Sequence, residues 1–74
     1  MMEDFLQLIT EVLEIEDRTI TAEDHFKQFD EWDSLARLSL IASIDDQYNV
    51  IIDDQTFTKL ETLQQLYDEI QGRI

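Results

Sequence analysis

Apolar residues recur every three or four positions in three separate stretches of this 74-residue chain, and this spacing constrains the fold more than any other feature. Such spacing puts the apolar side chains on one face of an α-helix. The chain contains no proline and only one glycine, so little in it interrupts a helix. We predict an all-α fold in which residues 1–74 form one domain. That domain is a small bundle of three main helices plus one short helix, with a long first loop.

The first main helix is predicted over residues 2–15, and the second over residues 35–48. Apolar residues cover more than half of the circumference of the second helix, so we expect it to be central and packed by several neighbours. The last helix is expected to begin at Thr62, because Thr62 and Gln65 match the capping-box pattern. Gly72 is suited to end that helix.

Two segments between these helices lack a sustained period. Residues 16–33 are predicted to form a long loop that Phe26, Phe29 and Trp32 pin to the core, and loops of this length in small domains are often functional. Residues 49–54 form a connection whose apolar patch is expected to be a tucked-in loop and not a strand. A short helical turn over residues 55–60 follows, with Asp54 as its cap and with Phe57 and Leu60 facing inward.

The tripeptide Asp33-Ser34-Leu35 opens the most apolar segment of the chain. Asp33 is a good helix N-cap, and Ser34 then occupies the first helical position with its hydroxyl at the rim of the fold. A helix N-terminus carries partial positive charge and unpaired donors, so it tolerates an attached phosphate. The tripeptide suggests a serine that carries a phosphodiester-linked group. Taken alone, however, such a tripeptide is usually only an ordinary helix start, because Ser and Asp are the commonest residues there.

Eighteen acidic residues against five basic ones give a formal net charge of −13. A field this negative repels nucleic acid and anionic membranes and attracts proteins with basic patches. The longest stretch without a charge, residues 38–44, is too short to span a bilayer, and no signal-peptide pattern is visible. We therefore expect a soluble, cytoplasmic protein, a monomer that neither binds nucleic acid nor inserts into a membrane.

The sequence offers little for catalysis or for metal binding. It has no cysteine, and its single histidine, His25, has no partner for a relay or a metal site. The acidic pairs Asp45-Asp46 and Asp53-Asp54 lack the ligand spacing and the glycine of a calcium loop, so we expect weak, charge-screening cation binding at most. No catalytic residue and no dedicated metal site are predicted.

Taken together, these features resemble the acyl carrier proteins over essentially the whole chain. The resemblance is carried by Asp33-Ser34-Leu35 in its register against the predicted helices, and by further segments along the chain. These are residues 22–26, Leu38, Leu40-Ile41, Asp45-Asp46, Tyr48, residues 50–52, Asp53-Asp54 and Thr62-Leu63.

The resemblance implies a carrier and not an enzyme. Ser34, flanked by Asp33 and Leu35, is expected to receive a covalent 4'-phosphopantetheine arm from coenzyme A through a phosphopantetheinyl transferase. The thiol of the arm is expected to hold acyl, polyketide or aminoacyl groups as thioesters. The expected partners are loading ligases or acyltransferases and ketosynthase-type enzymes with basic patches. The residues expected to dock them are Trp32, Arg37, Leu38, Asp45 and Asp46.

Several positions depart from the pattern common in fatty-acid carriers. Trp32 precedes the Asp-Ser pair, and Ala36, Arg37 and Ser39 stand where the second helix is usually acidic. These departures favour a carrier for a dedicated pathway, such as a secondary metabolite or a cell-envelope component, over the general fatty-acid carrier. The alternative from another class is an acidic helical adaptor that never receives a prosthetic group. Substitution of Ser34 by alanine separates the two, because an adaptor binds its partners unchanged and a carrier loses its cargo.

Overall fold

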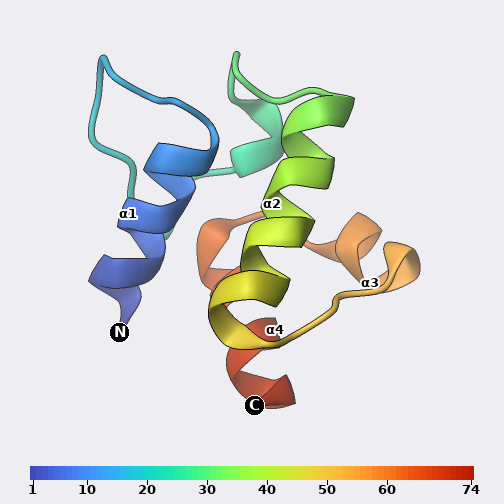
Figure 1. Cartoon of the computed structure of the whole chain (residues 1–74). Coiled ribbons are helices and arrows are strands. Elements are labelled where there is room, and N and C mark those ends of the chain that lie inside the picture. The colour runs from blue at the N-terminus through green and yellow to red at the C-terminus, as the bar shows by residue number, and fades with distance from the viewer.

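The computed structural model describes residues 1–74 and contains four α-helices and one short 3-10 helix (Figure 1). The only strand-like feature is an isolated bridge between His25 and Thr62. The predicted all-α fold, with three main helices and one short one, is therefore confirmed. The elements are α1 (Met2–Val12), η1 (Phe26–Gln28), α2 (Ser34–Tyr48), α3 (Asp54–Lys59) and α4 (Leu63–Arg73).

Figure 1 shows α1 and α3 on opposite sides of α2. Phe5 of α1 connects three of the helices, since its ring lies 6.3 Å from that of Tyr48 on α2 and 5.4 Å from that of Tyr67 on α4. The core consists of fifteen buried hydrophobic residues and contains no buried polar side chain. They are Phe5, Ile9, Leu13, Ile15, Ile20, Phe26, Leu40, Ile44, Val50, Ile52, Phe57, Leu60, Leu63, Leu66 and Ile70.

The second helix is less enclosed than its apolar content suggests. Only Leu40 and Ile44 of α2 are buried, whereas the side chains of Leu35 and Leu38 are 72% and 61% exposed. The prediction that several neighbours pack against this helix is therefore wrong for its N-terminal part. Periodicity identifies an apolar face but cannot tell whether the protein itself covers that face.

The first helix ends at Val12 and not at Ile15. Glu14 adopts a left-handed backbone conformation with a φ of 57°. The Glu14 amide donates to the Glu11 carbonyl and the Ile15 amide to the Thr10 carbonyl, which is the hydrogen-bond pattern of a Schellman motif. This reversal of the chain directs Leu13 and Ile15 into the core instead of along the helix axis.

The cap of α3 and the end of α4 also differ from expectation. Asp53, and not Asp54, caps α3 by accepting from the Thr56 amide at 3.1 Å. The capping box of α4 is confirmed, because the Thr62 and Gln65 side chains both bond to the backbone. That helix continues through Gly72 to Arg73, whose guanidinium bonds to Glu69 one turn earlier.

The long loop of residues 16–33 is closed by an ion pair between its two ends. Arg18 donates to both carboxylate oxygens of Glu31 at 3.1 and 2.8 Å and lies over the Phe29 ring. Phe26 is fully buried, and Phe29 and Trp32 pack partly buried against the core, so the predicted anchoring by aromatic residues is confirmed. The loop therefore holds the chain just before α2 in a defined position.

The connection between α2 and α3 contains no strand, as predicted, and Val50 and Ile52 are buried. The inward positions of Phe57 and Leu60 are confirmed as well. None of the helices combines the length and the apolar character needed to cross a membrane.

Candidate functional site

The start of α2 is set by Asp33, which has an extended backbone and accepts a hydrogen bond from the Ala36 amide at 2.7 Å. This contact satisfies one of the free donors of the first turn, as predicted. Ser34 is the first residue of the helix. The sequence therefore correctly located both the cap and the position of the serine on the helix.

Ser34 is exposed, and its hydroxyl takes part in no hydrogen bond within the protein. Each of the other two serines of the chain, Ser39 and Ser43, is partly buried. The next side chain, Leu35, is also largely exposed. A group attached to the Ser34 oxygen therefore extends into solvent without displacing protein atoms, and the donors at the start of α2 suit a phosphate there.

Three aromatic rings from separate segments pack together just before and beside this helix start. The Trp32 ring stacks on that of Phe57 with 6.0 Å between centroids and an interplanar angle of 9°. The Phe26 ring meets Trp32 and Phe57 edge-on, at 5.2 and 5.8 Å. Trp32 thus has a structural role, because it anchors the segment that leads into Asp33 and Ser34; contact of its accessible part with a partner stays a prediction.

Two cations attach α3 to the rest of the site. Arg37 Nη2 donates to Asp54 Oδ1 at 2.8 Å, and its guanidinium lies 5.3 Å from the centre of the Phe57 ring. Lys27 Nζ donates to the carbonyls of Phe57 and Thr58 and lies 5.5 Å from the same ring. Desolvation lowers the pKa of Lys27, and repulsion from the positive charge of Arg37 lowers it further by a smaller amount. No local pattern predicted these contacts, which join residues 17 to 31 positions apart.

The other residues expected to dock partners lie along α2. Leu38 is one turn from Ser34, and its side chain is exposed. Asp45 and Asp46 are exposed near the C-terminal end of the helix and form no ion pair. Asp45 is eleven residues from Ser34, a distance of about 17 Å along the axis at 1.5 Å per residue. Positions 34, 38 and 45 fall on the same side of α2, because separations of four and eleven residues are close to one and three turns of about 3.6 residues.

The acidic pair before α3 is engaged by basic and polar side chains. Asp53 accepts from Thr56 and from Arg73, and these hydrogen bonds lower its pKa to about 2. Asp54 accepts from Arg37. Nowhere in the chain do three or more His, Asp or Glu side chains come together in a group that could hold a metal ion.

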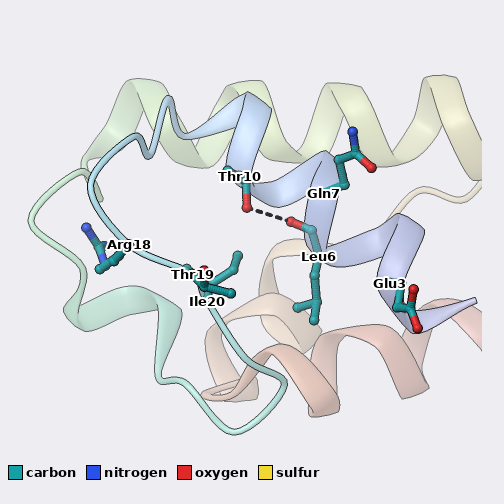
Figure 2. A pocket seen from close by; sticks show the side chains of 7 residues that line it. All are labelled: Glu3, Leu6, Gln7, Thr10, Arg18, Thr19 and Ile20. Atoms are coloured by element: carbon teal, nitrogen blue, oxygen red, sulfur yellow. Dashed lines mark hydrogen bonds between the residues drawn. The ribbon is translucent and has the colours of Figure 1, made fainter.

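The largest hollow of the surface lies away from Ser34. It has a volume of about 280 Å³ and lies between α1 and the loop that follows this helix (Figure 2). The hydrogen bond from Thr10 to the Leu6 carbonyl, at 2.8 Å, lies within the wall formed by α1. No residue of α2 lines this hollow, so it does not adjoin the serine. Its lining residues are Glu3, Leu6, Gln7, Thr10, Arg18, Thr19 and Ile20.

A smaller hollow of about 160 Å³ lies beside the start of α2. Leu35, Ala36 and Ser39 form its wall on α2, and the C-terminal end of α1 forms the opposite wall. Ser34 is not among the residues that line this hollow, although its neighbours Asp33 and Leu35 are.

Comparison with known proteins bears on this site. A family model described as "Phosphopantetheine attachment site" matches residues 3–70. Among solved structures, the solution NMR structure of a holo acyl carrier protein from Geobacter metallireducens is similar, with a TM-score of 0.81. The two proteins are 22% identical, and the likeness covers 96% of this chain and 82% of the other. A search of curated proteins gave no match.

Proposed function

Because this chain belongs to the phosphopantetheine attachment site family, we propose that it is a carrier protein whose Ser34 bears the prosthetic group. The expected covalent group of this family is 4'-phosphopantetheine, and its carrier proteins are not themselves catalysts. The observation that carries the assignment is the state of Ser34. It is the exposed serine of the chain, its hydroxyl is unbonded, and it is the first residue of a helix of 15 residues.

The residues around Ser34 indicate which groups of the attachment reaction come from this chain and which come from the transferase. The hydroxyl is a weak nucleophile unless a base takes its proton. None of the side chains of this chain forms a hydrogen bond to it, so the transferase must supply that base. The arm supplies a thiol for thioester formation. This chain contributes an accessible oxygen and a fixed helix start.

We place the docking surface on the exposed side of α2, around Leu38 and extending to Asp45 and Asp46, with Trp32 and Arg37 at its edge. Four of the five basic residues of the chain bind acidic or carbonyl oxygens within the protein. The surface left for a partner is therefore acidic, with exposed leucines beside the serine. A partner with basic side chains around an apolar depression complements it, and opposite charges speed their encounter.

Carriers of this kind act with phosphopantetheinyl transferases and with enzymes that handle acyl groups. We propose that the cargo is an acyl, polyketide or aminoacyl group, loaded by a ligase or an acyltransferase and used in a dedicated cytoplasmic pathway by the monomeric protein. The departures from the fatty-acid pattern at Ala36, Arg37 and Ser39 support a dedicated pathway. The absence of cysteine agrees with a compartment in which no disulfide is needed.

The test is incubation of the purified protein with coenzyme A and a broad-specificity phosphopantetheinyl transferase, followed by intact mass measurement. We expect one added phosphopantetheinyl group in the parent protein and in Ser39→Ala, and none in Ser34→Ala. An unchanged mass of the folded parent protein with several such transferases contradicts the proposal. It favours the acidic adaptor, which binds its partners equally well with Ser34→Ala.

A further inference from the structure

Arg37 is the basic residue closest to Ser34 in the sequence, and it lies three positions further along the same helix. Residues at this spacing are neighbours on the helix surface, with about 5–6 Å between their Cβ atoms. Long side chains on a helix lean toward its N-terminus and cover the preceding turn. An arginine at position 37 can therefore reach the turn of the helix that contains Ser34.

The guanidinium has unused capacity for hydrogen bonds. It donates once, from Nη2 to Asp54, and its other N–H donors have no acceptor in the protein. Asp54 is itself 85% exposed, so this ion pair is open to solvent on one side. An arginine fork binds a phosphate well because its donors match the spacing of the phosphate oxygens.

The negative charge around Ser34 favours such a cation. Asp30, Glu31 and Asp33 precede the serine, and the whole chain carries a charge of −13. A phosphodiester on Ser34 adds one more negative charge to this cluster. Arg18 cannot compensate for it, because both carboxylate oxygens of Glu31 already hold its guanidinium.

We propose that Arg37 binds the phosphodiester that joins the arm to Ser34 while it keeps its bond to Asp54, an inference that rests on the attachment proposed above. Arg37 is then a positioning residue, and it connects the modification site with α3. The connection continues into the core, since Arg37 also lies over Phe57, which is fully buried beneath it. Attachment of the arm is thereby expected to hold the six-residue α3 more firmly against α2.

Two measurements on the holo protein test this bridge. The first is the ³¹P resonance of the phosphodiester as salt is raised from about 0.01 M to about 1 M, over which the Debye length falls from about 30 Å to about 3 Å. The second is amide hydrogen exchange of Phe57, whose N–H donates to the Asp53 carbonyl within the first turn of α3. Both are compared between apo and holo forms, with modification verified by mass.

In the parent protein we expect a salt-dependent ³¹P shift and exchange of the Phe57 amide about two- to fivefold slower in the holo form, as for an exposed ion pair. Arg37→Gln should lose both effects. Asp54→Asn should keep the ³¹P effect and lose the slower exchange. Lys59→Gln removes the same charge from a residue without a hydrogen-bond partner, and it should behave like the parent.

A holo Arg37→Gln protein with the ³¹P shift and salt dependence of the parent overturns the binding of the phosphodiester. Equal exchange in apo and holo parent protein overturns the connection to α3. Failure of the serine to accept the group at all is a different result, because it is detected by mass before either measurement and contradicts the attachment itself.

Discussion

The two cations beside Phe57 are expected to make this phenylalanine more important for stability than an equally buried one. Phe57 contacts two aromatic rings, Trp32 and Phe26, and both Lys27 and Arg37 lie over it. Phe5 is buried to the same degree and also contacts two aromatic rings, but no cation lies over it. Phe5→Leu is therefore a matched control for Phe57→Leu.

Both substitutions remove a ring from a packed core and lose two aromatic contacts of about 0.5–1.5 kcal/mol each. Only Phe57→Leu also loses two cation–π contacts, worth about 0.5–1 kcal/mol each at exposed sites. We expect Phe57→Leu to lower the free energy of unfolding by about 1–2 kcal/mol more than Phe5→Leu does. This difference is large for a chain of this size, whose total stability is of the order of 4–11 kcal/mol.

Urea unfolding followed by the fluorescence of Trp32, the only tryptophan, measures this difference. With a slope of about 1 kcal/mol per molar urea, the midpoint of Phe57→Leu should lie about 1–2 M below that of Phe5→Leu. Because Trp32 stacks on Phe57, its fluorescence also changes with the substitution itself. Circular dichroism therefore serves as a second measurement of each midpoint, with a signal that does not depend on this contact. Coincident midpoints for the two variants refute the stabilising role of Lys27 and Arg37 at this ring.

Three further predictions concern single side chains. Asp33→Ala should lower the free energy of unfolding by about 1 kcal/mol and Asp33→Asn by little, because asparagine also caps a helix; equal losses in urea unfolding would argue against the cap. Asp53→Ala should be less stable than the parent at pH 7, and the gap should narrow as pH falls. The folded-state pKa of Asp53 is lowered to about 2, whereas an aspartate in the unfolded chain has a pKa of about 3.9. The stability that Asp53 contributes is therefore fully present above about pH 3.9 and is lost as pH falls toward about 2. A stability difference between the two proteins that does not change with pH in acid unfolding contradicts this. Leu38→Ser should change stability by less than about 0.5 kcal/mol, because the side chain is exposed, yet lower the kcat/KM of the transferase; an unchanged kcat/KM removes Leu38 from the docking surface.

The parts of the fold that the sequence predicted correctly depend on neighbouring residues. The cap at Asp33 and the capping box of Thr62 and Gln65 are local patterns whose partners lie three residues away. The end of α1 was missed because a glutamate, Glu14, takes the left-handed position that glycine usually signals. The prediction of Asp54 as the cap of α3 was wrong because the preceding residue, Asp53, is an equally suitable cap.

The parts that were missed at the site depend on contacts between distant residues. The pairing of Arg37 with Asp54 and of Lys27 with the end of α3 requires knowledge of how the helices are placed, which periodicity does not supply. The packing predicted around Leu35 and Leu38 on α2 was wrong for a related reason. Their spacing is that of a core face, and it shows only in the structure that no element covers them.

The central claim is that Ser34, and no other residue, carries the prosthetic group, and fragmentation mass spectrometry of the modified protein tests it most directly. Every fragment with the added phosphopantetheinyl group should contain Ser34, including fragments that end before Ser39. Detection of the group on Ser39 or Ser43, or modification of the Ser34→Ala variant, would contradict this claim. Either result would move the functional site away from the start of α2.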